Sequence, residues 1–410
     1  MIIMADKIIT VTNRAPVING AIVIHSGLIR EIGKADTIIR KYPGNRVVRM
    51  EHSLLMPGLV NAHVHLELPP LPDLIRTRGY ADWVLTIIKT KKDFTQNTYT
   101  SAVKQNINAI IASGATTVAE ICSHNASPAA ISQSGLRAVI YQEIISMEQI
   151  PRKVILPRRR RSSPLIKFGL SPHSSHTVSE AVLNVVRSYA AEKRLGICMH
   201  VAETQDELHL FQQKKSGLER LYAAVGWDVT QTPKARSSFE LLHRIGILSP
   251  DFLAVHAVHV DDRDLAIIRR SGAGIAHCPR SNHTIGVGTM RLNKFLAARI
   301  PVGLGTDSLA SSPSLNLWDE MRYAYRVHRR SGVIPQDIFL MATLGGAKAL
   351  GMDKDIGSLE PGKKADLIAV PFPQKDTGDL YSDLLRETNT CIMSMVNGHV
   401  IYRGEADVKA

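Results

Sequence analysis

The sequence has few cysteines, and they are far apart. Cys122, Cys198, Cys278 and Cys391 include no C-x-x-C pair. This spacing argues against a zinc site built from cysteines and against the disulfide framework of a small secreted protein. Unpaired cysteines are typical of a reducing compartment, so we expect a cytoplasmic protein with free thiols.

The chain also lacks long hydrophobic runs. No apolar stretch reaches the length of a membrane-spanning helix, and we therefore expect no membrane partner. The first residues, MIIMADKIITVTN, do not combine a basic region with a long apolar stretch and a small-residue cleavage site, so we expect no secretion signal. With 44% hydrophobic and 21% charged residues, the composition is that of a globular protein.

Acidic residues are in the minority. The chain has 37 Asp and Glu residues and 50 Lys and Arg residues, which gives a formal net charge of +13. Part of the excess lies in the run Arg158–Arg161, and part lies near Arg329. No zinc finger, RNA-recognition motif or helix-turn-helix accompanies these runs, so we expect no nucleic-acid partner. A basic surface of this kind serves solubility or attracts an anionic substrate.

The rhythm of the chain separates a long middle part from two β-rich ends. Between about residues 57 and 351, short apolar runs such as LGICMHVAE alternate with amphipathic stretches such as VSEAVLNVVRSYAAEKR. Eight such runs, each followed by a helix or a long loop, predict an α/β fold with a (β/α)8 TIM-like barrel over 57–351. Residues 1–56 and 352–410 show short β-like bursts with turn signals, and we expect them to form one composite β-sandwich domain.

Residues 61–67, NAHVHLE, place two histidines and a glutamate on alternate positions. In an extended strand these side chains project from one face. The pattern alone fits a half-exposed edge strand equally well. In a barrel, however, the working residues lie at the C-terminal ends of the strands, and six of the eight predicted strands end in titratable side chains. In chain order these are His63, His65 and Glu67; His173 and His176; His200 and Glu203; His256 and His259; His277 and His283; and Asp307.

Such a convergence of titratable groups indicates a metal or acid–base site. Catalytic zinc takes about three nitrogen or oxygen ligands and leaves a position for water. His63, His65 and His200 can supply imidazoles, and Asp307 can supply a carboxylate. The alternative outside enzymes is a basic binding protein or an inactive scaffold, which the complete set of acid–base residues disfavours.

The ordered motifs MPGLVNAHVHLE, MHVAET, VHAVHV, AHCPRSN, GLGTDSLASS and GSLEPGKKADLIAV resemble the amidohydrolase superfamily, and more narrowly its nucleoside and nucleobase deaminase branch. The resemblance runs through nearly the whole chain. It implies that the metal ligands are His63, His65, His200 and Asp307. It also implies that Glu203 shuttles a proton and that His256 polarises the attacking water.

The same resemblance implies one metal rather than two. Binuclear members bridge their metals with a carboxylated lysine at the end of strand 4, where this chain has SPHSSH, and Lys167 lies at the other end of that strand. We expect one divalent cation, Zn2+ first, with Fe2+ and manganese as alternatives. His259 and His277 match histidines that do not bind the metal in this branch, so we expect them to have supporting roles.

The implied reaction is hydrolytic deamination. A divalent metal lowers the pKa of water from about 15.7 to about 7, and Asp307 and His256 would orient the resulting hydroxide. Glu203 would deliver the proton to the ring nitrogen beside the attacked carbon, such as C6 of an adenine, and ammonia would leave.

Within the branch, HVHLE followed by YADWVLTIIKTKK is similar to the aminodeoxyfutalosine deaminases of the futalosine route to menaquinone, although their Trp-Leu pair is Trp83-Val84 here. Deaminases of S-adenosylhomocysteine and methylthioadenosine usually have a proline and a methionine after the second histidine. The leading substrate is therefore the nucleoside 6-amino-6-deoxyfutalosine. The alternatives are adenosine, methylthioadenosine or S-adenosylhomocysteine, and a triazine-like ring that loses chloride or amine.

The resemblance makes Glu143 and Ser146 candidate pocket residues. Trp83 is either a lid that stacks on the substrate or a core aromatic. Glu67 either binds ribose hydroxyls or satisfies buried backbone donors. The benzoate of aminodeoxyfutalosine needs a cationic or multi-donor partner, for which the candidates are Arg280, Arg76, Arg78 and His173. The oligomeric state stays open, with a homodimer as one alternative.

Overall fold

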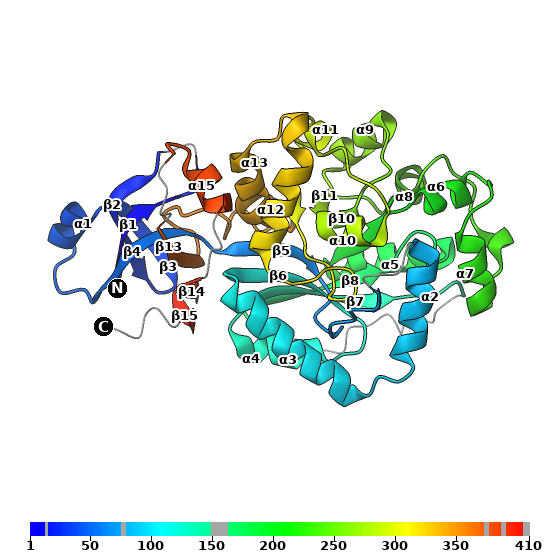
Figure 1. Cartoon of the computed structure of the whole chain (residues 1–410), viewed down its shortest axis with the longest axis horizontal. Helices are drawn as coiled ribbons and strands as arrows, with labels where there is room; N and C mark the ends of the chain where they lie inside the picture. The colour runs from blue at the N-terminus through cyan, green and yellow to red at the C-terminus, as the bar shows by residue number, and fades with distance from the viewer. Residues whose placement is uncertain (13–14, 75–78, 149–162, 373–376, 387–390, 405–410) are drawn as a thin grey trace.

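The computed structural model of this chain describes residues 1–12, 15–74, 79–148, 163–372, 377–386 and 391–404. Figure 1 shows a barrel wrapped by helices and, beside it, a smaller sheet that lies near both termini. The basic run Arg158–Arg161 and the candidates Arg76 and Arg78 lie outside the described residues.

The barrel is an eight-stranded sheet whose strands follow one another in chain order and pair in parallel. Its strands are β5 (Leu59–Val64), β6 (Ala115–Cys122), β7 (Arg137–Ile144), β8 (Ile166–Pro172), β9 (Gly196–Val201), β10 (Phe252–His256), β11 (Gly274–His277) and β12 (Val302–Leu304). The two ends of the sheet meet, because β12 contacts β5. Apolar side chains fill both faces of these strands, as parallel sheets require. The predicted (β/α)8 barrel is confirmed, and its strands are the eight apolar runs of the sequence.

Helices cover the outside of the barrel and the loops at its ends (Figure 1). They are α2 (Tyr80–Lys91), α3 (Gln96–Ala112), α4 (Ser127–Ser134), α5 (Glu180–Lys193), α6 (Gln205–Phe211), α7 (Leu218–Val225), α8 (Ser238–Ile245), α9 (Asp262–Ser271), α10 (Pro279–Ile285), α11 (Leu292–Ala297), α12 (Leu317–His328), α13 (Pro335–Leu340) and α14 (Gly346–Ala349), with short 3-10 turns at Val229–Gln231 and Arg329–Ser331 and a π-turn at Met341–Gly345. Among the described helices, none is long and apolar enough to cross a bilayer.

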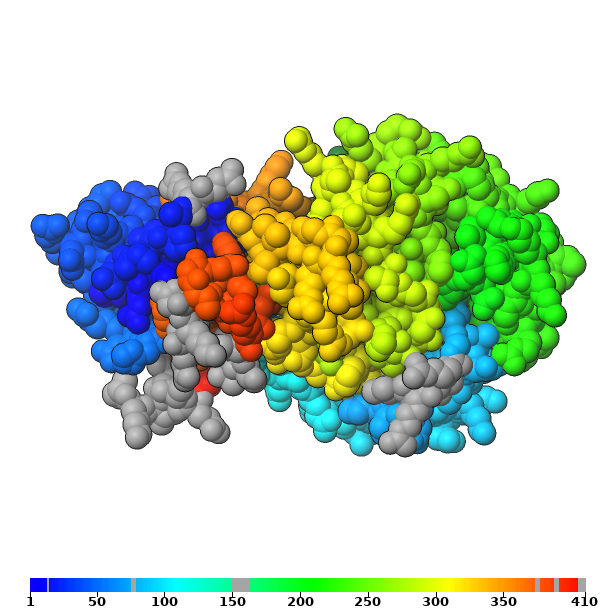
Figure 2. Space-filling model, turned by 45° about the horizontal axis from the view of Figure 1, so that its top comes forward, coloured from blue at the N-terminus to red at the C-terminus, as the bar shows by residue number. Residues whose placement is uncertain are grey.

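Both ends of the chain contribute to a second sheet of seven strands, in the order β15-β14-β13-β4-β1-β2-β3. The strands are β1 (Ile2–Ile8), β2 (Val17–His25), β3 (Leu28–Lys34), β4 (Val47–Pro57), β13 (Leu367–Pro371), β14 (Met393–Val396) and β15 (His399–Arg403), accompanied by α1 (Ala35–Lys41) and α15 (Leu380–Arg386). Figure 2 shows the blue N-terminal segment and the orange α15 side by side on one face. The composite β-region is confirmed, with all seven strands hydrogen-bonded into one sheet; the limits at 56/57 and 351/352 stay a prediction.

A buried ion pair joins the sheet to the barrel. Arg137, at the start of β7, donates from Nε and Nη2 to the two carboxylate oxygens of Asp366, just before β13, at 2.7 and 3.0 Å. Asp366 also accepts the Asn397 amide (2.8 Å), and its carbonyl accepts the Gly58 amide between β4 and β5. Both charged side chains are almost completely buried, so each one depends on the other for compensation.

We expect Asp366→Asn to destabilise the fold by about 3–5 kcal/mol, because it leaves the Arg137 guanidinium buried without a counter-charge. The matched control is Asp82→Asn, which breaks the Arg220–Asp82 pair, where the side chains are 66% and 50% exposed. Exposed pairs contribute at most about 1 kcal/mol. Urea unfolding followed by tryptophan fluorescence measures both variants; equal shifts of the two midpoints would contradict the role of the buried pair.

Candidate active site

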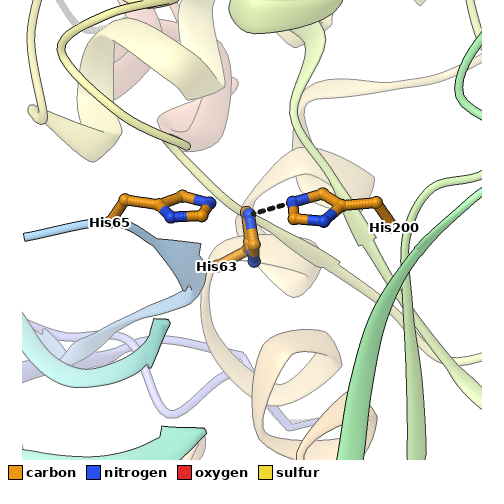
Figure 3. Close-up of side chains that lie close together, drawn as sticks. All are labelled: His63, His65 and His200. Atoms are coloured by element: carbon orange, nitrogen blue, oxygen red, sulfur yellow. Dashed lines mark hydrogen bonds between the residues drawn. The ribbon is translucent and has the colours of Figure 1, made fainter. Parts of the chain in front are cut away.

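Three histidines converge at the C-terminal end of the barrel strands. His63 in β5 and His65 just after it are alternate residues of one extended segment, and His200 lies in β9. One ring nitrogen from each lies within 4.8 Å of the others. Figure 3 shows the three rings pointing toward a common centre, with His63 Nε2 and His200 Nε2 3.3 Å apart.

Asp307 lies beside this cluster, just after β12. Its amide donates to the His63 carbonyl (3.1 Å), and it pairs with Val64 as a parallel bridge. Oδ1 lies 3.5 Å from His65 Nε2 and 3.8 Å from His63 Nε2. Oδ2 accepts hydrogen bonds from the hydroxyls of Ser281 (2.5 Å) and Ser311 (3.0 Å). The two serines thus hold the carboxylate so that its other oxygen faces the histidines.

The chemistry of these donors fits a divalent metal. His200 Nδ1 lies 2.8 Å from the His173 carbonyl, which can only accept, so Nδ1 carries the proton and the Nε2 lone pair faces the cluster. Burial, and then the neighbouring imidazoles, lower the pKa of His63. Burial also lowers the pKa of His65. Neutral imidazoles and one carboxylate are the donor set that zinc and related divalent ions prefer.

Glu203 and His256 form a buried pair next to the cluster. Glu203 Oε1 lies 3.6 Å from His256 Nε2. Burial, followed by the charges of Asp307 and Glu207, raises the pKa of Glu203 well above its usual range, which favours the protonated carboxyl. His256 Nδ1 lies 2.8 Å from Asn282 Oδ1, an acceptor, which leaves the His256 Nε2 lone pair facing the site. Burial lowers the pKa of His256.

The loop that carries Glu203 is held by Glu207, a completely buried residue of α6. One Glu207 oxygen accepts the Glu203 amide (2.9 Å), and the other accepts the Ala202 amide (3.1 Å) and the hydroxyls of Ser175 and Ser238. Ala202 has a positive φ of 53°. Glu207 therefore connects loops that follow β8 and β9 to the start of α8 and stabilises a backbone conformation that L-residues rarely adopt.

A cavity of about 320 Å3 opens above this cluster. Its polar floor includes His65, His200, Glu203, His256 and Asp307. Its outer wall is largely apolar and comes from α2 and from α7 with the residues after it. This volume lies within the range of small-molecule sites.

Four of the predicted substrate residues line the cavity: Glu67, Trp83, Glu143 and His173. Trp83 faces the cavity and also packs near Tyr80, at 6.3 Å between ring centroids. Its indole Nε1 donates to the Ala310 carbonyl at 3.2 Å. Glu143 accepts the Ser123 hydroxyl at 2.6 Å, and His173 Nδ1 lies 2.8 Å from Thr177 Oγ1.

The structure favours the anchoring alternative for Glu67. Its carboxylate accepts the backbone amides of Ser123, His124, Ala126 and Ser127 at 2.5–3.1 Å. The side chain is buried at the loop between β6 and α4. Four amide donors occupy both oxygens, so Glu67 orders this loop at the cavity wall, and a contact with ribose stays a prediction.

Ser146 and Arg280 are not among the residues that line this cavity, and their assignment as substrate residues stays a prediction. Ser146 Oγ donates to the Glu148 carbonyl on an exposed turn. Arg280 lies close to the carboxylates of Asp319 (3.8 Å) and Glu320 (3.9 Å). Its Nη1 also donates to the Ser314 hydroxyl at 2.9 Å, so the guanidinium is held against the start of α12 and the segment before it.

His259 and His277 are not among the residues that line the cavity. His259 Nε2 donates to the Val287 carbonyl at 2.8 Å, and His277 Nε2 lies 3.0 Å from His328 Nε2. Sequence reasoning assigned no role to Glu207, Ser281, Asn282 or Ser311. Ser281 and Asn282 lie four and five residues after His277 in AHCPRSN, and Ser311 lies four residues after Asp307 in GLGTDSLASS, so proximity in the chain was the available signal.

The sequence matches the model of the amidohydrolase family over residues 54–401. It is 31% identical to a 5-methylthioadenosine/S-adenosylhomocysteine deaminase of Moorella thermoacetica, over 88% of this chain and 83% of that protein. It is 30% identical to a 5′-deoxyadenosine deaminase of Methanobrevibacter smithii, over 86% of this chain and 80% of that protein.

Solved structures share the fold. Helicobacter pylori aminofutalosine deaminase, in complex with methylthio-coformycin, superposes with a TM-score of 0.89 at 22% identity and covers 98% of this chain and 100% of its own. A zinc-bound adenosine deaminase of Xanthomonas campestris gives 0.83 at 23% identity, over 97% of this chain and 92% of its own. The family match, the barrel and the cluster at its strand ends agree, and this chain belongs to the amidohydrolase family.

Proposed function

We propose that this protein is a metal-dependent hydrolytic deaminase of adenine nucleosides. The observation that carries the proposal is the placement of Glu203, His256 and Asp307 around the His63–His65–His200 cluster, on the floor of one cavity. The names of the Moorella and Methanobrevibacter relatives, both adenine-nucleoside deaminases, support it.

His63, His65, His200 and Asp307 would hold one divalent metal, with zinc as the leading candidate and iron as the alternative. A bound metal supplies a hydroxide nucleophile near neutral pH, because it lowers the pKa of water from about 15.7 to about 7. The zinc named with the Xanthomonas structure supports this choice.

The residues of the chain then move protons and position the reactants. Asp307 and His256, each held in one orientation by its own hydrogen-bond partners, orient the attacking oxygen. As that oxygen bonds to C6 of the adenine ring, Glu203 gives a proton to the adjacent ring nitrogen. The proton that remains on the added oxygen then passes through the Glu203 carboxylate to the amino group, the C6–N bond breaks as the C6–O bond becomes a carbonyl, and ammonia leaves. The raised pKa of Glu203 suits a group that must both accept and donate protons near neutral pH.

The leading substrate is 6-amino-6-deoxyfutalosine, which would place the enzyme in menaquinone biosynthesis. The Helicobacter structure supports it, and the curated relatives support the alternatives with smaller 5′ substituents. The apolar outer wall suits a nucleoside with an apolar 5′ substituent. The four cysteines are free and buried, which agrees with a cytoplasmic location.

Ammonia release from a substrate panel tests the proposed function. The panel is adenosine, methylthioadenosine, S-adenosylhomocysteine, 6-amino-6-deoxyfutalosine and guanine. We expect turnover of adenine nucleosides, highest in kcat/KM for 6-amino-6-deoxyfutalosine, and negligible turnover of guanine. Preferred turnover of guanine, or no ammonia from any adenine nucleoside by metal-loaded protein, would refute the proposal.

We expect Glu203→Gln to lower kcat by about 10²–10⁴-fold, because glutamine keeps the shape of the side chain but cannot carry the proton. The metal content per chain should stay at the level of the unmodified protein, since Glu203 is not among the proposed ligands. Glu192→Gln, on the exposed end of α5, is the control. Near-normal turnover by Glu203→Gln would remove the residue from proton transfer.

Asp307→Asn should lower both the metal content and the rate, because an amide is a weaker ligand than a carboxylate and cannot accept a proton. Metal analysis by mass spectrometry after gel filtration measures the first effect, and ammonia release measures the second. Asp251→Asn, which changes an exposed residue before β10, is the control. If metal and rate both stay unchanged in Asp307→Asn, this residue is not part of the site.

A further inference from the structure

One face of helix α2 forms a continuous strip along the cavity. The strip consists of Trp83, Val84, Ile87, Ile88 and Lys91, all of which line the cavity. Their spacing of three and four residues puts them on one side of an α-helix. At about 1.5 Å of rise per residue, the strip runs for about 12 Å from an aromatic side chain through aliphatic ones to a cation.

The two ends of the strip have different surroundings. At the Trp83 end, the indole donates to the carbonyl of Ala310, three residues beyond Asp307, so this end lies over the reacting groups. At the other end, Lys91 shares the cavity with His124 and Glu143. Burial lowers the pKa of His124, and the nearby Lys91 ammonium lowers it further, which agrees with this placement.

Lys91 is the only lysine or arginine among the described residues that line the cavity. Within the described part of the chain, the Lys91 ammonium forms no hydrogen bond and no ion pair. Glu143 lies on the same cavity, but its carboxylate is bonded to the Ser123 hydroxyl and makes no ion pair with Lys91. Lys91 is partly exposed and lies one helical turn after Ile87 and Ile88, so its ammonium is available to a group that reaches it along an apolar wall.

We propose that Lys91 is a specificity-determining residue that binds a carboxylate at the far end of the 5′ substituent of the nucleoside, an inference that rests on the proposed deaminase function. The aliphatic strip before Lys91 requires an apolar, preferably aromatic, spacer between the ribose and the anion. A single ammonium with a carboxylate nearby suits a monoanion better than a phosphate chain, because Glu143 would repel additional negative charge.

An interaction this far from C6 changes little between the bound substrate and the transition state. It should therefore lower KM for the anionic nucleoside and leave kcat nearly the same. If the Lys91 ammonium only reached solvent, removing it would change the KM values of anionic and neutral substrates equally.

The experiment compares two nucleosides that differ only in the carboxylate: 5′-deoxy-5′-(3-carboxyphenylthio)adenosine and 5′-deoxy-5′-(phenylthio)adenosine. Lys91→Met keeps most of the aliphatic stem and removes the charge. The matched control is Lys89→Met, because Lys89 is exposed on the same turn of α2 and does not line the cavity. The readout is the ratio of the two KM values for each protein.

We expect Lys91→Met to raise the KM of the carboxylate nucleoside, relative to the neutral one, by about tenfold or more. Lys89→Met should leave the ratio as in the unmodified protein. Equal ratios in the two variants would overturn the role of Lys91 while deamination of the neutral nucleoside keeps the proposed function intact. Failure of the unmodified protein to deaminate either nucleoside would overturn both.

Discussion

The meeting of β5 and β12 is the constraint on which the site depends. The Val64–Asp307 bridge and the hydrogen bond from the Asp307 amide to the His63 carbonyl hold the ends of these strands together. A Cβ on Gly305 would lie 2.8 Å from His63 Cβ, so only glycine allows this approach. Because β5 and β12 touch, the Asp307 carboxylate and the imidazoles of His63 and His65 lie together before any ligand binds. Catalytic sites need this kind of preorganisation.

The backbone at the same end of the barrel adopts conformations that are rare for residues other than glycine. Ala202, His256 and Asp307 all have positive φ, between 53° and 71°, although none is glycine. Such conformations cost about 1–3 kcal/mol each and persist only where the surroundings impose them. Glu207 imposes one through the amides of residues 202 and 203. The buried carboxylate therefore helps to aim Glu203 without touching the substrate.

The sequence predicted the parts that depend on short-range order. Buried parallel strands read as apolar runs, and His63 and His65 share a side because they alternate. Contacts between segments that are far apart in the chain could not be predicted in the same way. Arg280 looked free in the sequence, but its acidic partners lie about forty residues later, on α12. Lys91 was missed because an apolar strip at helical spacing also fits a core-facing helix, and only packing decides which face meets a cavity.

The reaction chemistry and the substrate contacts lie on different elements, and this separation affects how substrate specificity can evolve within the family. The proposed metal ligands and proton carriers lie at barrel strand ends, whereas the apolar outer wall and its cation lie on a helix that packs against α7. A few substitutions on one helical face can therefore retune which nucleoside is accepted and leave the reaction machinery untouched. Relatives with almost superimposable barrels can in this way differ in substrate specificity. Overall similarity is therefore a poor guide to the substrate, and the residues on the cavity face of α2 are a better one.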